Sequence, residues 1–498
     1  MGGDDHRCEW RARAEGLQGQ LDQANATIAT LTEKLTAVES TVEKLQRHVF
    51  GQRSEKMPPV AETIRDPAKA EAARIAALRT RRENIEKRRQ LTTRKIEHKV
   101  REEQKTCPKC GGHDFSRLGG GDVTELYDLV PAKVERQLHV QEKLRCRCGE
   151  TIITADPPAK VYDKARFGPT FIAQVVVSKC ADSLPLYRQA KAYRRAGVEV
   201  DDSTLGQLFH RAAEATKPLS KRLLQLVSEK EIVQADETTQ RVQAKGKTRT
   251  AWLWSFIARD EAEKEIISYV FSRSRSGETP LRVLGDSLGK LVADAYSGYN
   301  RVTLPGGRER AGCLAHLRRK FFEAQSTAPE LAKIAMDYIL DVYRVERAAL
   351  DADLLGTPEH LEMRQTQSAV IMEAFKAWLD LEEAQQLPKS PIGEAIGYAL
   401  SQWDALTLFL TDPHLPVDNN ASERALRVAA LGRKNFLFVG HDEAGENLAG
   451  LYSLIATCEA NGFNPVDYFA DVLLRVQTHP ASRIDELLPH RWKPTAPQ

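Results

Sequence analysis

Apolar and small residues near the start of the chain recur at alternating steps of four and three. This 3.5-residue period keeps one apolar seam facing a partner helix, and β-branched a positions with leucine at most d positions favour a parallel dimer. We predict a leucine-zipper coiled coil over residues 1–55; the alternative is an amphipathic helix packed on its own chain. The seam consists of Leu17, Leu21, Ala24, Ile28, Leu31, Leu35, Val38, Val42, Leu45 and Val49.

The next segment is polar and basic, with the run RTRRENIEKRRQLTTRK inside it. Its residues are good helix formers, so we predict a basic helical linker over residues 56–105. Such a segment is either a solvated spacer or a contact to DNA phosphates, because backbone contacts require only positive charge.

Four of the eight cysteines cluster in CPKCGG and CRCGE. The first motif is typical of half a zinc site, whereas the second is a C-x-C, one residue shorter than the common spacing. The residues between them alternate like a small hairpin, and a ribbon this small needs metal to fold. We predict a structural zinc ribbon over residues 106–155, with His113 and His139 as substitute ligands. The predicted ligands are Cys107, Cys110, Cys146 and Cys148.

Between residues 160 and 228 the apolar spacing becomes helical. The sequence LPLYRQAKAYRRAGVEVDDSTLGQLFHRAAEA predicts two helices and a glycine-containing turn, with Asp202 or Ser203 as the second N-cap. Basic residues on the first helix favour a helix-turn-helix-like DNA-binding domain; a purely structural helix pair is the alternative. The predicted DNA contacts are Arg188, Arg194 and Arg195.

From residue 229 the pattern becomes that of buried strands. Three strand-like runs, EIVQADETTQRV, AWLWSFIA and IISYVFS, precede a helical stretch and a fourth strand, KLVADAYSGYN. This order is that of the α/β RNase H-like fold, in which the first and fourth strands are neighbours. We therefore expect Asp236 and Asp294, at the ends of those two strands, to lie close together.

Close carboxylates suit phosphodiester chemistry because their hard oxygens bind Mg²⁺ or Mn²⁺. Two such ions activate the attacking oxygen and stabilise the leaving one. A third carboxylate is expected on a later helix, and VDNNASERALRVAALGRKNFLFVG supplies Glu423 in its first turns. Taken singly, Glu423 is compatible with an ion pair to Arg427, and the two aspartates are compatible with turn residues. Together, in this order, they favour a metal site.

Composition narrows the class of protein only slightly. The 498 residues indicate several domains, and the formal net charge of +3 says little about partners. No signal-peptide h-region and no apolar run of membrane-spanning length is visible. We expect a cytoplasmic, nucleoid-associated protein with no membrane partner.

Long motifs in the chain resemble the transposases of the insertion sequence 66 family. They are VSKCADSLPLYRQ, ADET, DAYSGYN, AGCLAHLRRKFFEA, PKSPIGEAIGYAL, DNNASERALR, GRKNFLFVG and LYSLIATCEANG, and FGQRSEK and CPKCGG also fit. The resemblance covers nearly the whole chain. It implies an Asp–Asp–Glu catalytic set at Asp236, Asp294 and Glu423, a zinc-binding domain and a helical insertion before the Glu. The C-x-C half and Val428, where Pro is expected, depart from the family pattern.

The expected organisation follows from these motifs. An RNase H-like catalytic domain covers residues 229–455, with a helical insertion at about 325–410, and a helical extension covers residues 456–498. Cys313 and His316 form a C-x-x-H that we interpret as a buried structural pair rather than a metal site. Basic residues beside the motifs are further predicted DNA contacts: Arg318, Arg319, Lys320, Arg433 and Lys434.

We predict a transposase that binds the terminal inverted repeats of an insertion sequence, cleaves the 3′ ends and joins them to target DNA. Its partners would be double-stranded DNA, further copies of the chain and helper proteins encoded by the element. Two alternatives stay open: a DNA-binding regulator derived from a transposase, and an RNase H-like nuclease that only cuts.

Overall fold

The computed structural model describes residues 133–145, 152–303 and 305–494, with a few positions nearer the start of the chain. Among these, residues 78–83 are helical, in agreement with the helix predicted for the basic linker. The predicted zipper, apart from single positions, and the four predicted zinc ligands lie outside the described residues. Within the described part, no helix is long and apolar enough to cross a lipid bilayer.

A five-stranded sheet with the order β5-β4-β3-β6-β7 forms the centre of the described part. The strands β3, β4 and β5 are antiparallel neighbours, whereas β6 runs parallel to β3 and β7 runs parallel to β6. Most residues of β5 and of the second half of β4 are buried, because helices cover the sheet. The bounds are β3 (Ile232–Ala244), β4 (Lys247–Arg259), β5 (Glu265–Ser272), β6 (Lys290–Val292) and β7 (Glu309–Ala311).

The predicted pairing of the first and fourth strands is confirmed, because β3 and β6 are hydrogen-bonded neighbours. Helix α6 (Glu278–Leu284) lies between β5 and β6 in the chain, as predicted. Asp236 lies inside β3 rather than at its end, since β3 continues to Ala244. The short strand β7 was not predicted, because three residues are too few for a hydrophobic alternation to be recognised.

Helix α14 (Asp442–Ala460) covers β5, which is an edge strand of the sheet. Ser453, Thr457 and Asn461 are spaced four residues apart, and each bonds to backbone groups of β5. These bonds satisfy a strand edge that otherwise exposes unpaired backbone groups. The polar positions of LYSLIATCEANG therefore have a structural use.

The predicted helix pair consists of α4 (Leu186–Arg195) and α5 (Asp202–Glu229), and the turn between them contains Gly197 at φ +81°. The N-cap of α5 is Asp201, whose carboxylate accepts a 2.6 Å bond from the backbone of Thr204. The predicted cap at Asp202 or Ser203 is therefore wrong by at least one residue. The reason is that Asp202 already belongs to the helix, whereas Asp201 has an extended backbone.

One hydrophobic core joins the sheet to α3 (Pro169–Cys180), α5, α14 and α15 (Pro465–Arg475). The segments predicted as a DNA-binding domain and a C-terminal extension thus share their core with the predicted catalytic domain. Short helical turns complete this part at η3 (Ser297–Val302), η6 (Ala481–Leu487) and η7 (Pro489–Arg491).

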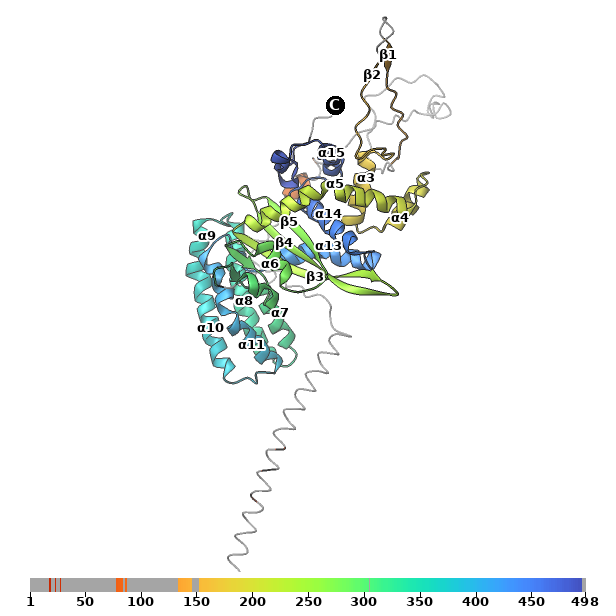
Figure 1. Ribbon diagram of the computed structural model, residues 1–498. Helices are drawn as coiled ribbons and strands as arrows, with labels where there is room; N and C mark the ends of the chain where they lie inside the picture. The colour runs from red at the N-terminus through yellow and green to blue at the C-terminus, as the bar shows by residue number, and fades with distance from the viewer. Residues whose placement is uncertain are drawn as a thin grey trace, which may run out of the picture. The chain divides into compact units, whose positions relative to one another are not determined.

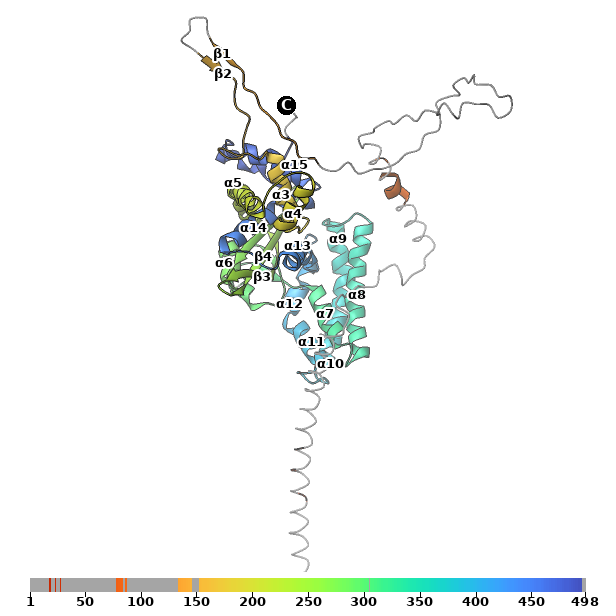
Figure 2. The same cartoon turned by 90° about the vertical axis from the view of Figure 1, so that its right-hand side faces the viewer.

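A helical bundle with a core of its own is inserted between β7 and α13 (Asn420–Phe436). Its helices lie side by side at one end of the sheet (Figures 1 and 2). The insertion is present as predicted, although its helices begin at Leu314. They are α7 (Leu314–Ala324), α8 (Pro329–Asp351), α9 (Pro358–Met363), η4 (Arg364–Ser368), α10 (Ala369–Glu383), α11 (Pro391–Ser401), α12 (Trp403–Thr407) and η5 (Leu408–Thr411).

A separate two-stranded pair, β1 (Lys143–Arg145) and β2 (Ile152–Thr154), brackets Cys146 and Cys148. The hairpin that we expected between the two cysteine motifs is not seen in residues 133–142, which have no strand. Instead, β1 pairs with residues after the second motif.

Candidate active site

Asp236 and Asp294 lie on neighbouring parallel strands. Gln234 of β3 pairs with Val292 of β6, and continuing this register by two residues sets Asp236 opposite Asp294. Strand neighbours are about 5 Å apart. The Asp294 carboxylate accepts a 3.0 Å bond from the backbone of Tyr296, which fixes the loop that follows β6. The structure thus brings two of the three predicted catalytic carboxylates together.

Helix α13 is fastened to β3 directly beside Asp236. Its N-cap, Asn419, is fully buried and donates from Nδ2 to the carbonyl oxygen of Ala235 over 2.7 Å. Glu423 lies in the first turn of α13. One hydrogen bond therefore sets the start of the glutamate helix against the strand position next to the first aspartate.

The residue before this cap also holds the helix start. Asp418 accepts a 3.0 Å bond from the backbone of Asn420 and a 2.8 Å bond from the hydroxyl of Tyr343 on α8. Both Asp418 oxygens are therefore engaged within the protein. Asp418, the carboxyl nearest in sequence to Glu423, therefore holds the start of α13 in place.

Helix α7 approaches Glu423 from the inserted bundle. His316 Nε2 lies 3.6 Å from one Glu423 oxygen, and the Arg319 guanidinium lies 3.6 Å from the other. Burial lowers the pKa of His316, while the charge of Glu423 opposes that shift. His316 Nδ1 is buried and has no hydrogen-bond partner among the described residues. The sequence singled out this histidine, but not its place beside the third carboxylate.

The charge of Asp236 is disfavoured in this environment. Burial, together with the negative charges of Glu237, Asp294 and Glu423, raises the pKa of Asp236 to about 7, although a bond from the backbone of Glu237 opposes the shift. The three predicted carboxylates are thus close enough to repel one another. A divalent cation would offset this repulsion, and carboxylate oxygens are the ligands that Mg²⁺ and Mn²⁺ prefer.

The donor set fits such a cation in chemistry, although it is not closed around one. In the part of the chain that the structure describes, no three His, Cys, Asp or Glu side chains form a ready metal centre. The candidate ligands come from three separate elements: β3, the loop after β6, and α13. The side chains of Asp236, Asp294 and Glu423 would therefore have to rearrange on binding.

The side chain of Glu237 lies on the face of the sheet opposite to that of Asp236, because adjacent strand residues point in opposite directions. Its buried carboxylate accepts bonds from the Arg275 guanidinium at 2.8 Å and from the Tyr299 hydroxyl at 2.7 Å. Both oxygens of the Glu237 carboxylate are thus engaged by side chains of the protein. The roles of Arg275 and Tyr299 were not predicted, because nothing in their local sequence indicates a partner 38 or 62 residues away.

A cavity of about 240 Å³ opens beside Asp294. Arg319 and Lys320, two predicted DNA contacts, line it together with His316 and Tyr398. Arg318 differs, because it is partly buried and its charge acts on Tyr343. Cations beside the carboxylates suit a phosphate-bearing substrate.

Arg310 contacts the loop that follows β6. Its guanidinium donates to the backbone carbonyl oxygens of Asp294 and Tyr296, the latter at 3.0 Å. It therefore orients the loop that presents the second aspartate. Sequence reasoning missed Arg310, since it lies outside any motif and acts on backbone atoms.

Cys313 is buried and accepts a 3.1 Å bond from the backbone of Asn419. Burial raises the pKa of its thiol to about 12. These properties agree with a structural role for the cysteine of the C-x-x-H motif. Its histidine, by contrast, faces Glu423.

The remaining predicted DNA contacts lie on α4 and on α13. Arg188, Arg194 and Arg195 are exposed on α4, although Arg194 is paired with Glu199 at 3.2 Å. Arg433 turns inward and donates to Thr238 and Thr239 of β3, so it ties α13 to the sheet. Lys434 is exposed.

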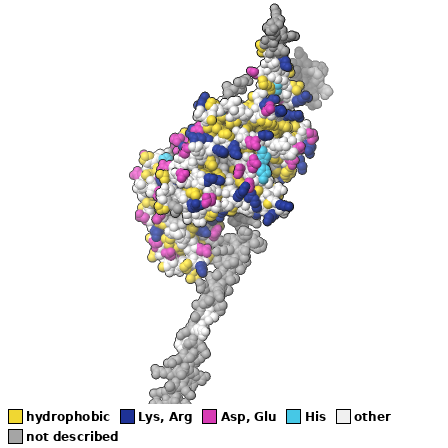
Figure 3. Space-filling view, in the orientation of Figure 1, with side chains coloured by type: hydrophobic (Ala, Val, Ile, Leu, Met, Phe, Trp, Pro, Cys, Tyr) yellow, Lys and Arg dark blue, Asp and Glu magenta, His cyan; other side chains and the backbone are white. Residues whose placement is uncertain are grey.

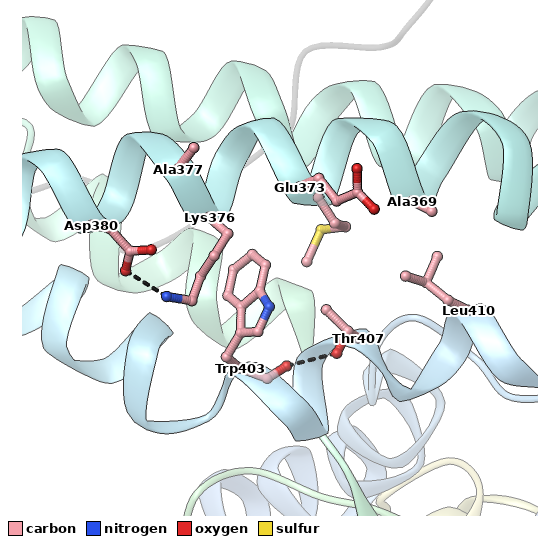
Figure 4. Close-up of a pocket in the computed structure, with 9 residues that line it drawn as sticks. Ala369, Glu373, Lys376, Ala377, Asp380, Trp403, Thr407 and Leu410 are labelled. Atoms are coloured by element: carbon pink, nitrogen blue, oxygen red, sulfur yellow. Dashed lines mark hydrogen bonds and ion pairs between the residues drawn. The ribbon is translucent and has the colours of Figure 1, made fainter.

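A second cavity, of about 320 Å³, lies within the inserted bundle (Figure 4). Trp403, Met372 and Leu410 line it, and its lysine, Lys376, is paired with Asp380. It contains none of the predicted site residues. We assign no chemistry to it.

Comparison with known families agrees with this geometry. Residues 164–447 match the model described as "Transposase IS66 family". Residues 453–490 match the IS66 C-terminal element, and residues 104–149 match the zinc-finger binding domain of transposase IS66. The matches include the sheet, the inserted bundle and both cysteine motifs.

Similar proteins occur in Sinorhizobium fredii. The chain is 31% identical over 496 residues to the protein named y4hP, covering 92% of this chain and 89% of that protein. It is 34% identical over 395 residues to y4qI, covering 76% and 72% of the two chains. The chain therefore belongs to the IS66 family of transposases.

Proposed function

We propose that this protein binds the terminal inverted repeats of an insertion sequence, hydrolyses the 3′ phosphodiester bonds and joins the freed ends to target DNA. The observation that carries the proposal is the convergence of Asp236, Asp294 and Glu423 from three elements. We propose these three as the catalytic residues and the ligands of Mg²⁺ or Mn²⁺. The sheet order, with three antiparallel strands followed by two parallel ones, supports an RNase H-like core.

Each step is an in-line displacement at phosphorus. In the first, a water oxygen attacks and a 3′-hydroxyl leaves; in the second, that hydroxyl attacks a target phosphate and another 3′-hydroxyl leaves. When bound, the divalent cation supplies stabilisation of charge on the attacking and leaving oxygens. Asp236, Asp294 and Glu423 would hold it, while Arg310 and Asn419 keep their backbones in place.

The proposed DNA binding is supported by the match to the IS66 zinc-finger family and by exposed basic side chains. The zinc-finger family match supports a structural zinc at the four clustered cysteines. Exposed cations on α4 and beside the carboxylates, such as Arg188 and Lys320, are suited to phosphate contacts. The zipper would hold two copies together, as joining two element ends requires.

A strand-transfer assay tests this function. It would use labelled element-end duplexes, target plasmid and Mg²⁺ or Mn²⁺, with any helper proteins of the same element added in a parallel arm. We expect joined product from the wild type and none from Asp236→Ala, Asp294→Ala or Glu423→Ala, with DNA binding retained. Asp286→Ala, at an exposed carboxylate outside the site, is the matched control.

The outcomes separate the candidate functions. Cleavage without joining would favour a nuclease, and binding without cleavage in every arm would favour a regulator. Joining that survives Glu423→Ala would mean that another group supplies the third carboxylate.

A further inference from the structure

The hairpin of β3 and β4 extends beyond the rest of the sheet (Figure 1). Pairing of β4 with β5 stops at Trp252, and pairing of β3 with β6 stops at Gln234. Residues 240–251 therefore pair mainly with each other, and a two-residue turn with Gly246 at φ +69° closes the tip. A hairpin that leaves its sheet needs an anchor or a partner, because an isolated pair of strands is only marginally stable.

One face of this hairpin is anchored to the protein. Val242 and Ala251 are buried in the main core. Arg249 is ion-paired with Asp442 at the start of α14, and Val439 forms a bridge to Val242. The hairpin is thus held as a rigid arm.

The other face is open, polar and positive. Arg241, Gln243 and Lys245 on β3 and the turn, with Thr248 and Thr250 on β4, are all exposed. Arg241 bonds to Thr250 at 3.1 Å rather than to an acid. Within the described part of the chain, Lys245 has no ion-pair partner, and residues 238–258 contain no Asp or Glu. Figure 3 shows Lys and Arg side chains gathered at the lower right, where Figure 1 places the hairpin.

The arm starts at the active site. Asp236 and the hairpin belong to the same strand, and Ala244 is eight residues further along β3. At about 3.3 Å per residue, the tip lies roughly 26 Å from the aspartate. This corresponds to about eight base pairs of duplex at roughly 3.4 Å each.

We propose that the open face of the β3–β4 hairpin binds the phosphate backbone of duplex DNA several base pairs from the bond that is cut. The proposal rests on the proposed function for the identity of the bound polymer. Lysine, arginine, amide and hydroxyl groups without acids are the donors that phosphates need, and such contacts carry no base sequence. Arg241 on this face and Lys245 in the turn supply the charge.

The test is a binding measurement in the full-length protein, in EDTA, so that it does not depend on catalysis. Arg241→Gln/Lys245→Gln would be compared with Lys264→Gln/Lys389→Gln, which removes the same charge at exposed lysines away from the hairpin. Element-end and unrelated duplexes would each be used in two lengths, ending about four or fifteen base pairs beyond the cleavage position. Thermal unfolding checks that both variants are folded.

We expect the hairpin variant to bind the long duplexes more weakly, whatever their sequence. Its slope of log affinity against log salt should fall by about 1.8, since each phosphate contact contributes about 0.9. The short duplexes and the control variant should show no change. An unchanged slope on long duplexes would overturn the hairpin proposal without affecting the proposed strand transfer. If the wild type formed no joined product in the strand-transfer assay, the proposed function alone would be overturned.

Discussion

At the scale of single residues, Asp236 is a carboxyl group kept where its charge is disfavoured. Burial is the main cause that raises its pKa to about 7, and the charges of Glu237, Asp294 and Glu423 contribute to that shift. Perturbed carboxylates of this kind are common at catalytic sites. Between about pH 4 and pH 7 the folded protein therefore holds a proton at Asp236 that the unfolded chain, with the usual pKa of 3.8, has already lost.

This shift predicts a pH-dependent cost of folding. Because the folded pKa is raised, stability is lost as the pH rises from about 4 to about 7. Without metal, wild type should lose roughly 2 kcal/mol relative to Asp236→Asn between pH 5 and pH 8. Denaturant unfolding in EDTA at both pH values measures the difference. If the difference in unfolding free energy between wild type and Asp236→Asn were the same at pH 5 and pH 8, the pKa shift would be contradicted. Added Mn²⁺ should make this difference smaller at pH 8.

Asn419 gives a second prediction at this scale. Replacing it by Ala leaves the buried carbonyl of Ala235 without its 2.7 Å donor, which costs about 1–3 kcal/mol. Because the bond sets α13 beside Asp236, strand transfer should fall more than DNA affinity does. Asn420→Ala, one residue later, removes only a local bond to Asp418 and serves as the comparison. Equal activity of the two variants would show that the bond positions nothing.

The sequence allowed the three carboxylates to be predicted, because each lies in a long motif at a recognisable place in the element order. The groups around them could not be predicted in this way. Arg310 acts on carbonyl oxygens, and His316 approaches Glu423 through the packing of α7. Contacts of this kind depend on tertiary structure and leave no periodic signal in the chain.

At the scale of elements, the edge strand β5 is completed by side chains of α14. Thr457 accepts from the backbone of Ile267 at 3.1 Å and donates to its carbonyl at 3.0 Å. Neither this helix nor its bonding to β5 was predicted from the sequence, in which LYSLIATCEANG stood out only as a family motif. The lengths of β3 and β4 were also underestimated, since their outer halves are polar and project beyond the core.

Thr457→Val keeps the volume and removes the hydroxyl. A buried N–H and a carbonyl then lose their partner, so we expect a loss of about 1–3 kcal/mol in unfolding free energy. Thr366→Val is a matched control, because that exposed threonine bonds only to its own helix, at Glu362. Similar stability of both variants in denaturant titrations would argue against the edge role of α14.

At the scale of the whole molecule, one body carries the sheet, α4 and the carboxylates, and the inserted bundle supplies α7 to the same site. The sequence indicated the order of these parts. It did not reveal that α5 and α15 share the core of the sheet, because amphipathic periodicity shows that a helix is buried but not against which element.

The zipper and zinc predictions belong to this scale. Deleting residues 1–55 should convert a dimer to a monomer in sedimentation and abolish paired-end joining while leaving binding to one end. A dimer that persists without residues 1–55 would place the interface elsewhere.

Cys107→Ser/Cys110→Ser should release zinc and weaken binding to element ends, with the core still folded.

We propose that Asp236, Asp294 and Glu423 together hold the catalytic divalent cation. The most direct measurement replaces each by cysteine in turn and compares strand transfer in Mg²⁺ and in Mn²⁺, since a thiolate is a poor ligand for Mg²⁺ and a better one for softer ions. We predict that each variant is inactive with Mg²⁺ and regains activity with Mn²⁺, while the wild type and Asp286→Cys work with both. A variant that is fully active in Mg²⁺, or folded and binding DNA yet inactive in both metals, would contradict direct ligation by that residue.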